Sequence, residues 1–132
     1  MGTRSRIGIK QEDGKIKSVY CHWDGYPSNN GKILLENYIT KEQVEELLSH
    51  GDMSSLYKNC NGADGHTYDK PVKDQTIYYH RDRGETLNSA VIHDTPDDAN
   101  QEEYLYVFET DKWIVHEGGS RMTIQEAIEK DS

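Results

Sequence analysis

Four arginines of this chain form two Arg-x-Arg pairs, Arg4 with Arg6 and Arg81 with Arg83. Alternate residues of a strand point to the same face, so each pair would present two guanidinium groups together. Guanidinium groups match phosphate oxygens bidentately, so a paired presentation suits a phosphate-bearing ligand. The alternative is that each pair lies on a solvated strand face or pairs with local carboxylates.

The segment 20–27 (YCHWDGYP) gathers aromatic, titratable and turn-forming residues at the expected end of a strand. The chain has nine tyrosines against two tryptophans and one phenylalanine, a bias typical of interfaces and base-stacking platforms. We expect Trp23 and Tyr26 to stack on a base, and His22 or Asp24 to read a base edge. Alternatively, Trp23 fills the core and Tyr26 only shapes the turn.

The segment 78–85 (YYHRDRGE) is the second cluster. We interpret it as a basic loop with its own counter-ions that can grip an anion. Arg81 and Arg83, with Arg4 or Arg6, would then hold phosphates, and Tyr79 would offer a stacking ring beside His80.

Two His-x-Asp pairs, His22/Asp24 and His80/Asp82, raise the possibility of an open metal site. Arginine beside the would-be ligands disfavours a cation, and neither HExxH nor a cysteine-rich spacing is present. Cys21 and Cys60 are far apart and lack an activating context, and no serine lies in a nucleophile elbow. We therefore expect no metal, no cofactor and no catalytic residue.

Composition and charge limit the class of protein. The 132 residues suit one domain, mean hydropathy is -0.94, and no apolar run approaches a membrane span or a secretory signal. We expect a reducing cytoplasm, since two distant cysteines form no disulfide framework. The net charge is -9, yet residues 1–66 hold 8 bases and 9 acids, whereas 67–132 hold 7 and 15. This distribution disfavours long nucleic acid without excluding a small phosphate ligand.

The chemistry-bearing segments need elements to position them. Residues 3–11 and 15–23 alternate like a β-hairpin, with Ile7 and Ile9 opposite Arg4 and Arg6. A loop at 24–30 precedes a helix at 31–38. A second helix begins at Thr40, with a capping box, and ends at Gly51. Residues 52–57 suggest one short turn.

The second half is expected to add loops, a hairpin and a helix. Residues 59–75 and 93–103 are polar loops, and 76–79 is a strand entering a turn at Gly84. Residues 103–109 and 113–117 form a hairpin that is apolar on both faces, which indicates central strands or cover by a partner subunit. A short helix follows the cap at Thr123. We predict one α+β domain over 1–132, with two β-hairpins in a small antiparallel sheet and two to three short helices.

Several strings together resemble a widespread family of small tailed-phage proteins: GTRSRIG near the start, VYCHWDGYP, GD-x-SSL at 51–56, YYHRDRGE, and YLYVFE followed by a tryptophan. That family is similar to the one containing anti-CBASS proteins, which act as sponges for cyclic nucleotides of antiphage defence. The resemblance covers about two thirds of the chain, and the segments 59–75 and 93–102 match no such pattern.

The resemblance implies a phage immune-evasion protein in the cytoplasm of an infected bacterium. It would be a homo-oligomer, such as a tetramer, that binds a cyclic dinucleotide of the cyclic GMP-AMP type without cleaving it. A two-fold symmetric ligand also suits a two-fold protein axis.

Two other functions stay open. One is a protein-interaction inhibitor whose acidic second half mimics nucleic acid; it predicts that neutralising Asp94, Asp97 and Asp98 abolishes activity while Arg81→Ala is harmless. The other is a phosphodiesterase that uses the two His-x-Asp pairs.

Overall fold

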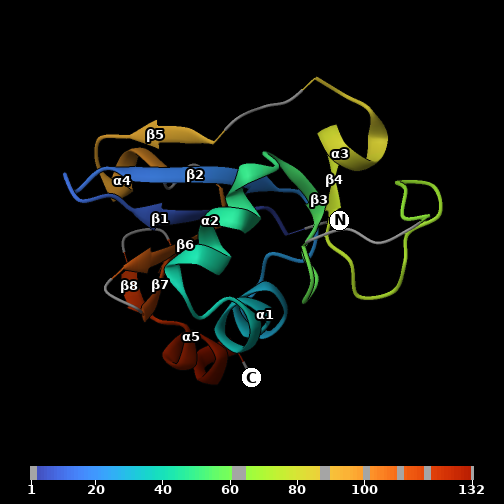
Figure 1. The fold of residues 1–132 in the computed structure, drawn as a ribbon. Helices are drawn as coiled ribbons and strands as arrows, with labels where there is room; N and C mark the ends of the chain where they lie inside the picture. Colours follow the sequence, from blue (N-terminus) through green and yellow to red (C-terminus); the bar gives the residue numbers. More distant parts are fainter. Residues whose placement is uncertain are drawn as a thin grey trace.

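A computed structural model gives the structure of residues 3–60, 65–86, 90–99, 102–109, 112–117 and 120–131 (Figure 1). The strands are β1 (Ser5–Lys10), β2 (Ile16–Cys21), β3 (Met53–Ser55), β4 (Ile77–Tyr78), β5 (Val91–His93), β6 (Tyr104–Glu109), β7 (Lys112–Glu117) and β8 (Ser120–Thr123). The helices are η1 (Pro27–Gly31, a π-helix), α1 (Lys32–Asn37), α2 (Lys41–Ser49), α3 (Tyr79–Arg83), α4 (Pro96–Ala99) and α5 (Ile124–Asp131).

The α+β class is confirmed, but the sheet is larger than predicted and is mixed rather than antiparallel. Within the described residues it has eight strands in the order β4-β3-β2-β1-β6-β7-β8, with β5 pairing β2 beside β3. Strands β3, β4 and β5 have only two or three residues, too few for an alternating pattern to mark them in the sequence.

Both predicted hairpins are present. β1 pairs antiparallel with β2, and β6 pairs antiparallel with β7. The turn at 110–111 lies outside the described residues. The hairpins join through parallel pairing of β1 with β6, where Ser5 lies opposite Tyr104 and Ile9 opposite Phe108. Strand β6 is therefore central, which explains why its residues are apolar on both faces.

Helices α1, α2 and α5 cover one face of the sheet (Figure 1), and the main core fills the space between. Helix α2 begins as predicted: the Thr40 side chain accepts the Gln43 N–H, and the Gln43 side chain accepts the Thr40 N–H. Its inward side chains are Val44, Leu47 and Leu48, all buried. Ile124 and Ala127 anchor α5 in the same core.

The opposite face is also partly covered, which the sequence did not indicate. A small apolar cluster there consists of Ile16, Ala99, Leu105 and Val107, with Ala99 supplied by α4. Arg6 lies on this face and is only 9% exposed, so β1 is buried on both sides. The alternative of a solvated strand face was wrong for Arg6, because helix α4 packs against β2 on this side of the sheet.

Three local predictions were wrong. Residues 53–55 form strand β3 instead of a helical turn. The expected strand at 76–79 stops at Tyr78, and α3 replaces the rest of it up to Gly84, whose left-handed backbone (φ 80°) ends the helix. The expected loop at 24–30 contains the start of η1. None of the helices in the described ranges is long and apolar enough to cross a membrane.

Candidate functional site

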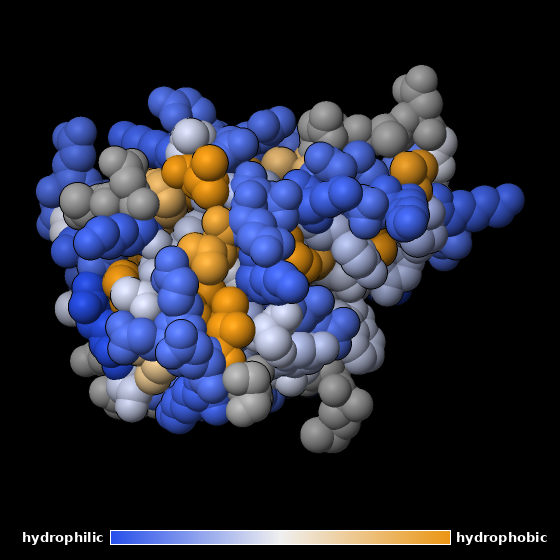
Figure 2. Space-filling view, turned by 90° about the horizontal axis from the view of Figure 1, so that it is seen from below, coloured by the Kyte–Doolittle hydropathy of each residue, from blue (hydrophilic) through white to orange (hydrophobic). Residues whose placement is uncertain are grey.

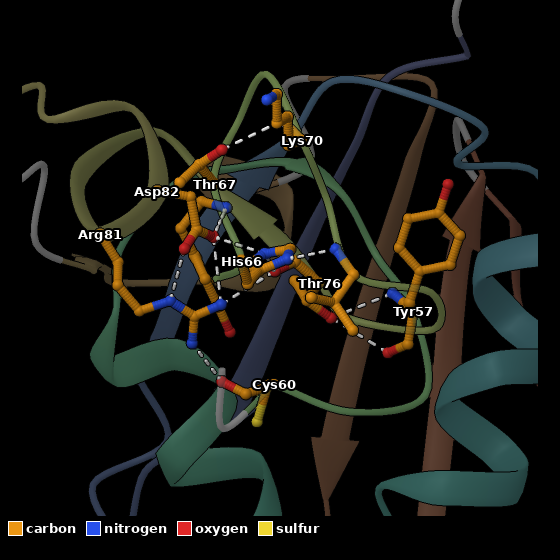
Figure 3. A network of polar contacts seen from close by, with 10 residues as sticks. Tyr57, Cys60, His66, Thr67, Lys70, Thr76, Arg81 and Asp82 are labelled. Carbon is orange, nitrogen blue, oxygen red and sulfur yellow. Dashed lines mark hydrogen bonds and ion pairs between the residues drawn. The ribbon is translucent and has the colours of Figure 1, made fainter. Parts of the chain in front are cut away.

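Arg81 is held inside the protein by a ring of acceptors (Figure 3). Its Nε donates to Asp82 Oδ1 at 2.9 Å, and its Nη1 donates to the Cys60 carbonyl at 2.6 Å. Its Nη2 donates to the Thr76 carbonyl at 3.0 Å and to Asp82 Oδ2 at 3.1 Å. The guanidinium also lies 4.8 Å from the centre of the Tyr78 ring. These contacts fix Arg81 as a clamp between β4 and the segment that follows β3.

The Asp82 carboxylate is the centre of this cluster, with a side chain only 3% exposed. Its Oδ2 also accepts the Tyr78 N–H at 2.8 Å. Burial acts to raise the pKa of the Asp82 carboxyl, but hydrogen bonds from Arg81 and from the Tyr78 N–H outweigh it, so the pKa lies below its ordinary value. Asp82 is therefore a buried anion stabilised by hydrogen bonds from the Arg81 guanidinium and from the Tyr78 N–H.

His66 completes the cluster from the polar segment 59–75. Its Nδ1 accepts the Val72 N–H at 2.9 Å, which leaves the neutral ring's proton on Nε2. That Nε2 lies 3.2 Å from Asp82 Oδ2 and 3.3 Å from the Thr76 carbonyl. The His66 side chain is 1% exposed. A buried histidine thus ties this segment to α3.

The arginines of the second pair point in different directions, because they lie on a helix rather than on a strand. Successive helical residues turn by 100°, so positions two apart fall on nearly opposite sides. Arg81 turns inward, whereas Arg83 is about half exposed. The expected common face of these two guanidinium groups is therefore not formed.

In the first pair, too, one arginine binds protein acceptors and the other is exposed: Arg6 is buried and Arg4 is not. Arg6 Nε donates to Ser18 Oγ at 2.9 Å, and Nη2 donates to the Ser18 carbonyl at 3.2 Å. Burial lowers the pKa of Arg6, opposed by the charges of Asp52 and Glu102. Arg4 is exposed and has no hydrogen-bond or ion-pair partner within the described ranges. Arg4 thus remains available to an external anion.

Arg83 lies over the first of two stacked tyrosine rings, Tyr68 and Tyr79. Its guanidinium carbon lies 4.7 Å from the centre of the Tyr68 ring, and the Tyr68 and Tyr79 rings stack at 6.4 Å and 30°. The Tyr68 N–H donates to the Asp82 carbonyl, so the buried cluster positions these rings. Arg83 also forms an exposed ion pair with Glu85 at 3.3 Å. A ligand anion can compete for a cation held so loosely.

A second aromatic group follows the end of β2. The Tyr20 hydroxyl lies 2.8 Å from His22 Nδ1, and the His22 and Trp23 rings meet edge to face at 4.7 Å. Trp23 is 41% exposed, so it does not fill the core. Burial raises the pKa of Tyr20, while the positive charge of Arg4 acts in the opposite direction. Ser5 pairs with Cys21 at the end of β2, so Arg4, the residue before Ser5, lies next to this group.

Asp52 connects the two aromatic groups. Its Oδ1 accepts the Tyr20 N–H at 2.9 Å, and its carbonyl accepts the Tyr79 N–H at 3.3 Å. Strand β3 lies between β2 and β4, which brings segments far apart in the sequence to one end of the sheet. We call the resulting set the aromatic–basic surface: Arg4, Tyr20, His22, Trp23, Tyr68, Tyr79 and Arg83.

The remaining predicted residues lie at the margin of this surface. His80 lines a small hollow of about 50 Å³ together with Asp52 and Tyr79, and its Nδ1 is 2.7 Å from the Glu85 carbonyl. Asp24 and Tyr26 are exposed in the turn after Trp23. Asp24 has a left-handed backbone (φ 55°), a conformation that aspartate tolerates better than most residues.

Neither cysteine in the described part of the chain is an activated nucleophile. Burial raises the pKa of Cys21 to about 12 and also raises that of Cys60, so neither thiol is disposed to ionise. His80 and Asp82, both on α3, contact different groups: His80 lies against the Glu85 carbonyl, and Asp82 accepts the Tyr78 N–H. Across the described ranges, no group of three or more His, Cys, Asp or Glu side chains could hold a metal ion. The arrangement instead offers rings and guanidinium groups for binding.

Sequence reasoning missed three of the residues that build this region. Tyr68 and His66 lie in a polar segment without periodicity, and only the surplus of tyrosine hinted at Tyr68. Asp52 was marked only as the start of a turn. Comparison of the chain with protein-family models, curated proteins and solved structures gave no match.

Proposed function

We propose that this protein binds a cyclic dinucleotide of the cyclic GMP-AMP type and sequesters it without cleavage, as a phage sponge against CBASS signalling. The observation that carries the proposal is the aromatic–basic surface, in which the exposed Arg83 lies over the stacked pair of Tyr68 and Tyr79 and the exposed Arg4 lies at the end of β2, where Trp23 follows. Guanidinium groups suit the phosphates, and the tyrosine and tryptophan faces suit the bases.

The division of the arginines revises the ligand contacts within this proposal. Arg4 and Arg83 hold the phosphates, because Arg6 and Arg81 already donate to protein acceptors. Trp23 and Tyr79 stack on bases, and His22 or Asp24 reads a base edge. His80 and Tyr26 bound the site.

The proposal includes a homo-oligomer, such as a tetramer, built from two-fold related pairs of subunits. One surface supplies few cations for a ligand with two phosphates, and a second copy related by two-fold symmetry doubles them. The edge strand β5 supports association, because Val91 and Ile92 are 50% and 59% exposed there. An uncharged exposed edge favours pairing with another strand.

Calorimetry with cyclic GMP-AMP and related cyclic nucleotides tests the proposal. We expect Arg4→Ala and Arg83→Ala each to weaken binding about tenfold, as expected for a lost hydrogen bond to a charged group. Arg121→Ala is the matched control, since Arg121 is exposed and pairs with Glu109 on another part of the sheet. The ligand should be recovered intact after heating, and native mass spectrometry should give one ligand mass per symmetric pair of subunits.

Three outcomes contradict the proposal. If no cyclic di- or trinucleotide binds below ~10 μM, sequestration is excluded. A ligand returned hydrolysed, with or without added divalent metal, indicates a phosphodiesterase. If neutralising Asp94 and Asp98 abolishes the biological activity while Arg4→Ala and Arg83→Ala are harmless, the acidic interaction inhibitor is correct instead.

A further inference from the structure

An apolar groove lies on the helical side of the sheet, away from the aromatic–basic surface. Its volume is about 380 Å³, within the range of small-molecule sites. Figure 2 looks onto this side and shows a strip of hydrophobic side chains among hydrophilic ones. The groove is lined by Leu35, Ile39, Phe108, Lys112, Trp113, Thr123 and Gln125.

The floor of the groove is rigid and its outer wall is exposed. Phe108 and Trp113 are 3% and 4% exposed, and their rings meet at 5.2 Å. The Trp113 indole N–H donates to the Tyr38 carbonyl at 2.7 Å, so the ring's orientation is fixed. Ile39, by contrast, is 58% exposed. An apolar ligand would therefore bind without displacing the floor and would cover Ile39.

Lys112 is the one charged residue among those that line the groove. The chain has 24 acidic residues, but none is among the seven that line the groove. Lys112 has no ion-pair partner within the described ranges, because Glu109 opposite it pairs with Arg121. The Thr123 hydroxyl is occupied by Glu126, whereas the Gln125 amide has no partner in the same ranges. The Lys112 ammonium and the Gln125 amide therefore line the groove beside the apolar rings of its floor.

We propose that this groove binds a small hydrophobic anion: an aromatic or aliphatic acid whose apolar part lies on Phe108 and Trp113. The acid group pairs with the Lys112 ammonium and accepts from the Gln125 amide. The site shares no residue with the aromatic–basic surface and does not depend on the function proposed above. It gives the protein a second ligand class, selected by charge at the rim and by apolar contact at the floor.

Two fluorescent probes of similar shape and different charge test the proposal: anilinonaphthalene sulfonate, which is an anion, and N-phenylnaphthylamine, which is neutral. The chain has two tryptophans, so Trp23→Phe leaves Trp113 as the reporter of energy transfer to a bound probe. We expect saturable transfer with both probes, with the sulfonate bound more tightly. All variants below are made in this background and first checked for cooperative thermal unfolding.

Lys112→Met keeps the aliphatic stem and removes the charge. It should weaken the sulfonate about fivefold, as for a part-exposed ion pair, and leave the neutral probe unchanged. Ile39→Ser should weaken both probes. Lys73→Met, at an exposed lysine in the loop before β4, is the matched control and should change neither.

Several results overturn the proposal. The first is that no saturable energy transfer from Trp113 is seen below about 100 μM probe. The second is that Lys112→Met weakens both probes equally. The third is that Lys73→Met weakens the sulfonate as much as Lys112→Met does. If sedimentation shows that Ile39→Ser dissociates an oligomer, the groove is an interface between copies of the chain and the small-ligand site is refuted.

Discussion

The two Arg-x-Arg pairs look alike in the sequence but are positioned by different elements. Arg4 and Arg6 lie at the start of a strand, whereas Arg81 and Arg83 lie on a short helix. Each pair nevertheless contributes one arginine that is buried or part-buried and binds protein acceptors, and one exposed arginine of the aromatic–basic surface. The common pattern is a structural arginine next to an available one, not a pair that acts together.

The two structural arginines, Arg81 and Arg6, differ in how many protein groups depend on them. Arg81 satisfies two backbone carbonyls and a buried carboxylate, so its loss would leave acceptors and a charge without partners. Arg6 satisfies one serine, through its hydroxyl and carbonyl oxygens. The comparison therefore predicts a graded series of effects on the free energy of unfolding, which substitutions can measure.

The largest effect is expected for Arg81→Ala. Removing Arg81 takes the guanidinium partner from the buried Asp82 carboxylate and leaves only the Tyr78 N–H and His66 beside it, so the free energy of unfolding should fall by about 3 kcal/mol. Urea unfolding followed by circular dichroism measures the change. A loss below about 1 kcal/mol would show that water replaces the guanidinium and that Arg81 is not a clamp.

Asp82→Asn tests the same cluster through pH. Because the folded-state pKa lies below the ordinary value of 3.8, the carboxylate stabilises the fold at pH values above 3.8, and this contribution is lost as pH falls through the folded pKa. The difference in unfolding free energy between the parent and Asp82→Asn should therefore shrink in that acid range. A difference that stays constant from pH 6 down to about pH 2 contradicts the assignment.

Gly25→Ala tests the support of the first pair. An added Cβ would lie 2.7 Å from both Ser5 Cβ and the Thr3 carbonyl oxygen, on either side of Arg4. We expect a loss of about 2 kcal/mol, as for overpacking, measured as a lower urea midpoint. Gly25 also donates to the Thr3 carbonyl at 2.7 Å, so the substitution displaces the segment that carries Arg4. Unchanged stability would mean that this segment moves aside freely.

Arg6→Lys should have a smaller effect, about 1 kcal/mol, since lysine cannot reproduce both hydrogen bonds to Ser18. Differential scanning calorimetry is the measurement. Arg4→Lys is the matched control and should leave the melting temperature unchanged. Equal effects at the two positions would remove the distinction between the buried and the exposed arginine.

The smallest effect on stability is expected for Arg4→Ala and Arg83→Ala, within about 0.5 kcal/mol of the parent. Both side chains are exposed, and the Arg83–Glu85 ion pair is exposed too. Thermal unfolding measured alongside ligand calorimetry separates the two properties. If either variant unfolds as readily as Arg81→Ala, that arginine is structural and cannot be assigned to the ligand alone.

The sequence predicted those parts of the fold that local rules determine. The capping box at Thr40 and Gln43, the hairpin strands and the helix after Thr123 depend on residues close in the chain. The parallel pairing of β1 with β6 depends on partners distant in the chain, and no local pattern encodes it. Strands as short as β4 exist only because a neighbour pairs with them.

The candidate site was predictable in composition but not in the role of each residue. The aromatic and basic types at 20–27 and 78–85 indicated a binding surface, and the order β2-β3-β4 brings the two segments together. Which arginine of a pair turns inward depends on where its acceptors lie. For Arg81 these include the Cys60 and Thr76 carbonyls, which only the folded chain brings to the guanidinium group. That information resides in the tertiary structure.

The parallel contact between β1 and β6 also constrains how the chain folds. Ser5 meets Tyr104 only after a long loop has closed, and such non-local pairing slows the folding of small domains. During synthesis, the first hairpin would leave the ribosome well before its central partner and would wait with an unpaired edge. A chaperone that shields β1 until β6 emerges would raise the yield of native protein.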